Sequence, residues 1–161
     1  MVYRIIQASR SFPERLLVFV ITLTLGWGAA CYAEPLNEDK PFAERHLVLQ
    51  LSDADAAHQK AILNISNNLI RHYGGPDFID IQVVVFGPGV LLLASKDNTH
   101  SKRIRSLMDN GVSFRICQNT LDSMESESGQ AFSYLSGVDV VRSGVAHILD
   151  EVDRGYVLVR P

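Results

Sequence analysis

The stretch that decides the fold is FIDIQVVVFGPG, residues 78–89. The part up to Phe86 is almost continuously apolar and rich in β-branched side chains, which is typical of a strand covered on both faces. The two glycines that flank Pro88 end this strand in a turn. Because strands of this kind occur mainly in parallel sheets between layers of helices, the stretch predicts an α/β domain.

Strand and helix patterns alternate on both sides of this stretch. Four further short strands are predicted at HLVLQLSD, VSFRIC, VDVV and YVLVRP, residues 46–53, 112–117, 138–141 and 156–161. Apolar residues at helical spacing predict a helix after Asp55, one around Ile104 and a last one capped by Ser143, which has Val145, Ile148, Leu149 and Val152 on one face. Residues 90–95 predict a short helical turn, and the polar residues 122–130 predict a loop or a frayed helix. The order predicts a single three-layer domain with a five-stranded, mainly parallel sheet flanked by helices.

The N-terminal residues differ from the rest of the chain. Three arginines precede the apolar run Leu16 to Trp27, and small residues follow up to Ala33. This is the layout of a secretory signal peptide over residues 1–33, and it predicts a periplasmic protein. An uncleaved anchor or a lipidated Cys31 are the alternatives, although the apolar run is shorter than the roughly 20 residues of a membrane span. Residues 34–44 are predicted to be a flexible linker, and residues 45–161 the α/β domain.

Charge and cysteine content narrow the classes of function. The chain has a formal net charge of −3, and it becomes more acidic without the signal, because three arginines and one glutamate leave with it. This balance argues against nucleic acid or an anionic membrane as partner. Of the two cysteines, only Cys117 remains after the signal, so the mature domain cannot form an internal disulfide. Such a cysteine is a buried apolar residue, an intermolecular partner or a reactive thiol.

Cys117 ends a predicted parallel strand, at the edge of the sheet where α/β folds bind ligands. Asn119 and Thr120 follow, and either is a suitable cap for a helix that starts near Leu121. Backbone N–H groups at such a start favour a thiolate. The competing interpretation is an inert buried cysteine, because free cysteine is among the most buried residue types.

The loop Gly87-Pro88-Gly89 follows the central predicted strand and is a candidate for anion binding by its N–H groups. It lacks the Lys and Ser/Thr of a P-loop and the third glycine of a dinucleotide site, so a plain turn is the alternative. The apolar VLLLA that follows is predicted either to form an interface or to be buried. No cofactor and no metal site are predicted, because none of the histidines forms a metal-binding pair in the sequence: His46, His58, His72, His100 and His147.

Three stretches, VVVFGPGV, LMDNGVSFRICQNTL and GVDVVRSGVAHILDEVDRGYVLVRP, resemble the DsrE/DsrF-like family over residues 45–161. The resemblance implies a flavodoxin- or Rossmann-like α/β fold and association as trimers or hexamers. It also implies sulfur carried as a cysteine persulfide, in sulfur oxidation or in transfer-RNA thiolation. Cys117 matches a family cysteine. The predicted signal peptide excludes the cytoplasmic transfer-RNA reaction.

The leading hypothesis is therefore a periplasmic sulfur-carrier or sulfurtransferase-like protein that holds sulfane sulfur on Cys117 and exchanges it with a donor or acceptor protein. The residues predicted to line its site are Asn119, Thr120, Gly87, Gly89 and Ser143. The alternative is a non-enzymatic oligomeric scaffold or ligand-binding protein in which Cys117 only packs. A third hypothesis is a redox switch through intermolecular pairing of Cys117.

Overall fold

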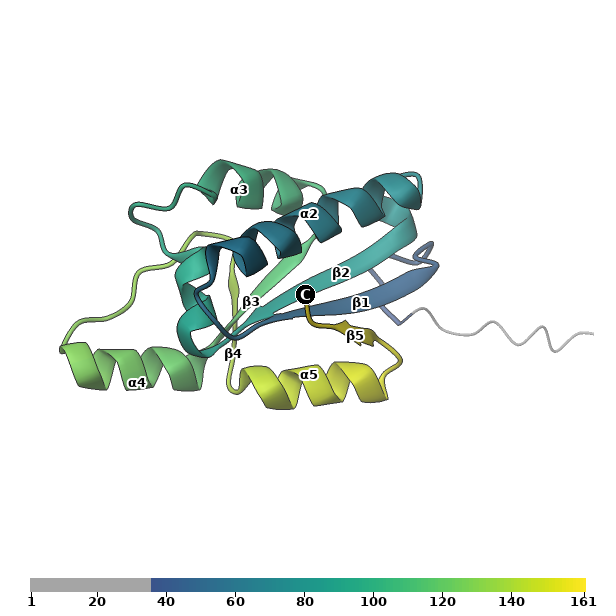
Figure 1. Ribbon diagram of the computed structural model, residues 1–161. Helices are drawn as coiled ribbons and strands as arrows, with labels where there is room; N and C mark the ends of the chain where they lie inside the picture. The colour runs from purple at the N-terminus through teal and green to yellow at the C-terminus, as the bar shows by residue number, and fades with distance from the viewer. Residues whose placement is uncertain (1–35) are drawn as a thin grey trace, which may run out of the picture. The chain divides into compact units, whose positions relative to one another are not determined.

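A parallel five-stranded sheet forms the centre of the domain. The computed structural model describes residues 36–161, so the predicted signal peptide lies outside the described residues. The strands are β1 (Arg45–Leu51), β2 (Ile79–Val85), β3 (Ser113–Cys117), β4 (Asp139–Val141) and β5 (Val157–Val159). Their order is β4-β3-β2-β1-β5, and every neighbouring pair is parallel (Figure 1). The predicted α/β architecture is confirmed.

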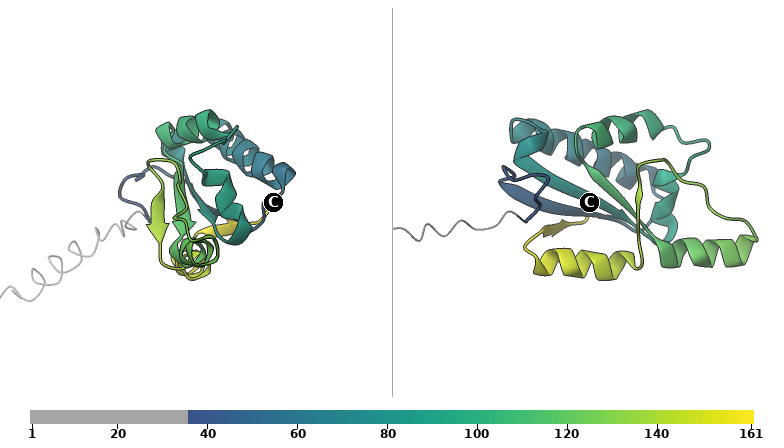
Figure 2. Two further views of the ribbon diagram at one scale, coloured as in Figure 1. Left: turned by 90° about the vertical axis from the view of Figure 1, so that its left-hand side faces the viewer. Right: turned by 180° about the vertical axis from the view of Figure 1, so that it is seen from behind.

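Helices cover both faces of this sheet (Figures 1 and 2). On one face lie α2 (Ala56–His72), the 3₁₀ helix η3 (Gly87–Leu93) and α3 (Ser101–Asp109); the short η2 (Pro76–Phe78) precedes β2. The other face is covered by α5 (Gly144–Asp153), while α4 (Gln118–Ser128) projects from the carboxyl edge of the sheet. None of the helices within residues 36–161 combines the length and the apolar character that crossing a membrane requires.

The central strand β2 is buried along its whole length, as its sequence predicts. Ile81 and Val83 point into the large apolar core beneath α2 and α3. The intervening residues Asp80 and Gln82 point to the α5 face and are also buried. The α5 face therefore has a smaller apolar cluster beside buried polar groups; its members are Val48, Val84, Ile148 and Tyr156.

The predicted apolar face of the last helix does not all face the core. Ile148 is buried against the sheet, but Val145, Leu149 and Val152 are 51%, 59% and 39% exposed. The reason is the rotation of α5, which turns the buried Glu151 toward the sheet together with Ile148. The predicted helix capped by Ser143 is confirmed, and α5 presents three of the apolar side chains of that face at the surface.

Residues 122–130, predicted as a loop or frayed helix, belong mostly to α4. This helix ends at Gly129, which adopts the left-handed conformation with φ 69°. Leu121 is its one buried residue, so an apolar stripe is absent from its sequence. Local contacts support the helix instead, such as the 2.6 Å hydrogen bond from the Gln118 amide to the Asp122 carboxylate four residues later.

The segment predicted as a flexible linker makes specific contacts from Leu36 onward. Leu36 packs on the smaller apolar cluster, and the Asn37 amide donates to Asp80 Oδ2 over 2.9 Å. Lys40 Nζ donates to the carbonyl of Ile79 over 2.9 Å. Burial lowers the pKa of Lys40, although the nearby carboxylates of Asp80 and Asp77 oppose the shift. Residues 36–44 thus lie against the amino edge of the sheet.

Candidate functional site

A crevice opens at the carboxyl edge of the sheet between β2 and β3. After β2 the chain turns into η3 on the face of α2, whereas after β3 it turns into α4 on the side of α5 (Figure 1). Connections that leave neighbouring parallel strands in opposite directions leave room for a ligand between them. The crevice brings together the end of β3 at Cys117, the start of η3 at Gly87 and the first turn of α4 at Thr120.

Cys117 occupies the N-cap position of α4, with an extended backbone at φ −76° and ψ 117°. Its thiol is free and only 5% exposed. The backbone N–H groups of Asn119 and Thr120, in the first turn of α4, lie near enough to the sulfur to lower the pKa of the thiol, although the Asn119 N–H itself donates to the Arg142 carbonyl over 3.3 Å. The N–H of Gly144, the first residue of α5, lowers the pKa of the thiol in the same way. The amino ends of two helices therefore meet at one thiol and present partial positive charge to it.

These donors determine the acidity of the thiol. Burial alone raises the pKa of Cys117, but the polar groups of Gly144, Thr120 and Asn119 near the sulfur outweigh it, and the net effect is a lowered pKa. A cysteine buried in purely apolar surroundings has a raised pKa and is inert. The surroundings of Cys117 instead favour the thiolate, which is the nucleophilic form of cysteine.

Thr120 does not cap α4, and the prediction of a helix start near Leu121 was wrong by three residues. The helix begins directly after the strand at Gln118, so Thr120 lies within its first turn. Its Oγ1 accepts a 2.9 Å hydrogen bond from the N–H of Gly87. The same hydroxyl helps to lower the pKa of the Cys117 thiol. Thr120 thus connects the loop after β2 to the thiol after β3.

The other residues predicted for the site have different positions. Gly87 and Asn119 line a cavity at the crevice. Gly89 is buried, and a Cβ there would lie 2.3 Å from the carbonyl oxygen of Leu51, so this glycine permits close packing of η3 on β1. The Ser143 hydroxyl caps α5 by accepting the N–H of Ala146 over 3.4 Å.

Sequence reasoning missed the contribution of Gly144 to the site. A Cβ at this position would lie 3.1 Å from Phe86 Cδ1 and 3.4 Å from Cys117 Cβ, so glycine allows the start of α5 to approach the thiol. The N-cap residue Ser143 predicts a helix that starts at Gly144, and this was the sequence feature from which the position of Gly144 could have been inferred. A helix that starts after the strand beside β3 directs its first N–H groups to the same edge of the sheet.

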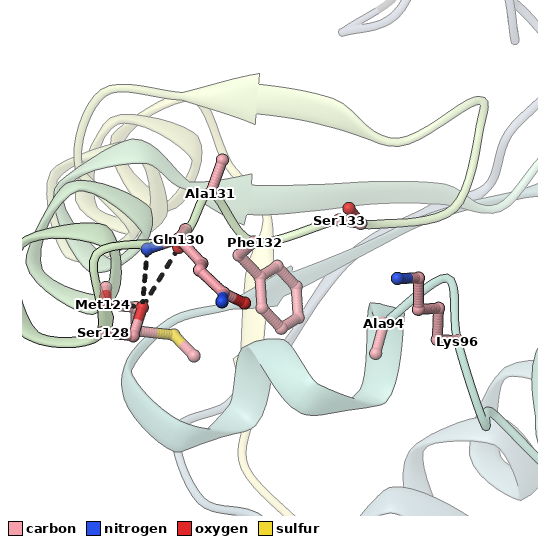
Figure 3. A pocket seen from close by; sticks show the side chains of 8 residues that line it. All are labelled: Ala94, Lys96, Met124, Ser128, Gln130, Ala131, Phe132 and Ser133. Atoms are coloured by element: carbon pink, nitrogen blue, oxygen red, sulfur yellow. Dashed lines mark hydrogen bonds between the residues drawn. The ribbon is translucent and has the colours of Figure 1, made fainter.

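Two cavities lie between η3 and α4. The first, of about 560 Å³, begins beside Cys117 and is lined by Gly87, Pro88, Leu91, Asn119, Thr120, Ser123, Met124 and Glu127. The second, of about 290 Å³, lies farther along α4 (Figure 3) and is lined by Ala94, Lys96, Met124, Ser128, Gln130, Ala131, Phe132 and Ser133. Cys117 lines neither cavity. In the VLLLA segment, Leu92 is buried, whereas Leu91 is 46% exposed and lines the first cavity.

A separate polar cluster lies under α5. Gln82 Oε1 accepts from Arg115 Nε over 2.9 Å and lies 3.0 Å from His147 Nε2. Burial lowers the pKa of His147, assisted by the nearby charge of Arg115. Asp80 accepts hydrogen bonds from the Tyr156 hydroxyl and from the Asn37 amide. Within residues 36–161, no three His, Cys, Asp or Glu side chains are grouped so as to hold a metal ion.

Comparison with known proteins gives a family and a structural neighbour. The model of the family described as "DsrE/DsrF-like family" matches residues 45–161. The protein of unknown function MTH1491 from Methanobacterium thermoautotrophicum has 29% identity and a TM-score of 0.64, covering 73% of this chain and all (100%) of that one. A second structure, the protein of unknown function BT1422 from Bacteroides thetaiotaomicron, has 14% identity and a TM-score of 0.47, with 72% of this chain and 94% of that one covered. No curated protein matches the chain.

Proposed function

Since this chain belongs to the DsrE/DsrF-like family, we propose that it is a periplasmic sulfur carrier which holds sulfane sulfur on Cys117 as a persulfide. The observation that carries the proposal is the position of Cys117 at the amino end of α4 and against the first residue of α5, Gly144, where the nearby N–H groups and the Thr120 hydroxyl lower the pKa of the thiol. The signal-peptide pattern of residues 1–33 supports the periplasmic location.

The transfer is a thiolate displacement without net oxidation. The Cys117 thiolate attacks the outer sulfur of a donor persulfide, R–S–SH, and the donor S–S bond breaks. R–S⁻ leaves, and Cys117 holds S–SH; an acceptor thiolate reverses the reaction. A lowered pKa of Cys117 increases the fraction of thiolate available to attack the donor. It also makes the Cys117 thiolate a better leaving group when the acceptor takes the sulfur. With Cys117 as the one cysteine after residue 33, no internal thiol competes for the persulfide.

The carrier is proposed to act as a homo-oligomer, a trimer or hexamer, that meets a sulfur donor and an acceptor protein. Exposed apolar side chains on α5 and β5 support association: Val145, Leu149, Val152 and Leu158 are 51%, 59%, 39% and 42% exposed. Apolar surfaces of this kind commonly mark interfaces between proteins. Light scattering measures the mass of the oligomer, which is expected to fall when Leu149→Glu introduces a charge on α5. An oligomer of unchanged mass would show that the interface lies elsewhere.

The carrier hypothesis is tested by intact mass. The purified protein is incubated with polysulfide or thiosulfate, and the expected result is the gain of one sulfur atom that a reductant removes. The gain is expected to be absent in Cys117→Ser and retained in Ser123→Ala, a control at an exposed hydroxyl on the same helix. No gain on the wild type, or an equal gain on Cys117→Ser, would contradict the proposal.

The burial of Cys117 favours a second candidate, an oligomeric scaffold without catalysis. The thiol is 5% exposed and lines neither cavity of the crevice. In that case iodoacetamide alkylates Cys117 only after denaturant is added. A carrier is expected to react in the folded state, and more slowly when Thr120, which lines the cavity and influences the thiol, is replaced by a larger residue.

A further inference from the structure

The two cavities beside the site are parts of one groove between η3 and α4. They share Met124 as a common wall, and both lie along the same side of α4. From Thr120 to Ser128 the helix advances about 12 Å, at 1.5 Å for each residue. With volumes of about 560 and 290 Å³, the combined space is that of a typical small-molecule site.

The middle of this groove is apolar and partly exposed. Leu91 is 46% exposed at the surface of η3. Met124 and Phe132 pack only partly against the core, and Figure 3 shows the Phe132 ring between Gln130 and Ala94. Methionine adapts its shape to what it contacts, so Met124 is suited to separate or join the two cavities. An aliphatic chain laid along these side chains would remove apolar surface from water on both sides.

The two ends of the groove differ in charge. Lys96 lines the end remote from Cys117, and Figure 3 shows its ammonium group turned toward the cavity. Within the part of the chain that the structure describes, this ammonium makes no ion pair. The end near Cys117 is lined by the neutral side chains of Asn119 and Thr120, whereas the carboxylate of Glu127 lies about 10 Å farther along α4, at the far end of the same cavity. Lys96 is the basic residue that lines the groove, so a ligand anion is favoured there over the neutral end at Thr120.

The geometry points to a binding site for a linear amphipathic monoanion, such as a medium-chain carboxylate. Its anionic head pairs with Lys96, its aliphatic chain covers Phe132, Met124 and Leu91, and its far end reaches Thr120 beside Cys117. The site does not depend on sulfur transfer, since none of these contacts involves the thiol. An extended peptide fits less well, because its backbone would need hydrogen-bond partners along an apolar floor.

Calorimetric titration with carboxylates from hexanoate to dodecanoate, below their micelle concentrations, tests this site. Affinity is expected to rise about fourfold for each added methylene until the groove is filled, and then to level off. Lys96→Gln is expected to weaken decanoate binding about two- to fivefold and to leave 1-decanol unchanged. Leu91→Gln, at a half-exposed position, is expected to weaken both ligands about four- to tenfold.

Lys102→Gln is the matched control, because Lys102 is an exposed lysine on α3 outside both cavities. Equal weakening of decanoate by Lys96→Gln and Lys102→Gln would show a general charge effect and overturn the proposal. Absence of saturable decanoate binding would overturn it as well, and so would binding of a short acidic apolar peptide in place of decanoate. Repeating the titration with Cys117→Ser keeps the result separate from sulfur transfer: binding is expected to persist even if the carrier function fails.

Discussion

The Thr120 hydroxyl has two effects that Thr120→Val removes together and that separate measurements distinguish: it accepts the Gly87 N–H, and it lowers the pKa of Cys117. Valine has nearly the shape of threonine but neither donates nor accepts a hydrogen bond. The Gly87 N–H then loses its acceptor at 2.9 Å. Because this hydrogen bond is only partly buried, the loss is expected to cost about 1 kcal/mol of folding free energy. For a domain of this size the expected fall in Tm is about 3–5 °C.

The second effect of Thr120→Val falls on the thiol. Removing the hydroxyl takes away a donor that favours the thiolate, so the pKa of Cys117 rises toward its ordinary value. The ultraviolet absorbance of the thiolate, recorded against pH with Cys117→Ser as the blank, reports this directly and needs no reagent to reach the sulfur. Thr120→Ser keeps the hydroxyl and is expected to titrate like the wild type. A Tm that falls while the titration midpoint stays unchanged would refute the bond between hydroxyl and sulfur.

Three further outcomes follow from the packing around the site and the sheet. Gly89→Ala is expected to reduce the free energy of unfolding by about 3 kcal/mol and to lower Tm by about 10 °C or more, because its Cβ would lie 2.3 Å from the Leu51 carbonyl oxygen. Gly129→Ala, which has open space around it, is the control and is expected to cost about 1 kcal/mol. Burial lowers the pKa of His46, so the unfolded chain binds more protons and stability falls as the pH drops below about 6.5; His46→Phe is expected to reduce that loss in urea unfolding between about pH 7 and pH 5. Lys40→Met, which removes hydrogen bonds of 2.9 and 3.1 Å to two carbonyls, is expected to lower the urea midpoint by the equivalent of about 1–2 kcal/mol.

The fold was predictable because its signals are local. A continuous apolar strand at β2, a cap at Asp55 that accepts the N–H of Ala57 over 2.7 Å, and a cap at Ser143 each lie within a few residues in sequence. The helix α4 was not predictable in the same way. Its one buried residue, Leu121, leaves no apolar periodicity, so its polar residues resemble those of a loop.

The site was predictable only in part, for a related reason. The position of Cys117 at a strand end follows from the strand pattern, but its donors come from separate parts of the chain. Gly87 reaches Thr120 across 33 residues, and Gly144 reaches the thiol from the start of another helix. The hydrogen-bond partners of the buried Asp80 are also distant in sequence: Asn37 is 43 residues away and Tyr156 is 76 residues away. Contacts over such separations depend on strand order, which no local pattern specifies.

The environment of Cys117 distinguishes a packing cysteine from a carrier better than its exposure does. A cysteine that only fills space needs apolar neighbours. Polar donors beside a neutral thiol would lose their hydrogen bonds to water and gain only weak hydrogen bonds to sulfur. Here the N–H groups at the amino ends of α4 and α5 lower the pKa of the thiol, and glycine at position 144 lets the backbone of α5 approach Cys117. A negatively charged sulfur uses these donors fully, because hydrogen bonds to an ionised acceptor are about twice as strong as neutral ones. For the proposed carrier, burial of Cys117 at 5% exposure would limit the access of solvent oxidants to a thiolate or persulfide, and Thr120, which lines the cavity at the crevice, connects that cavity to the surroundings of the thiol.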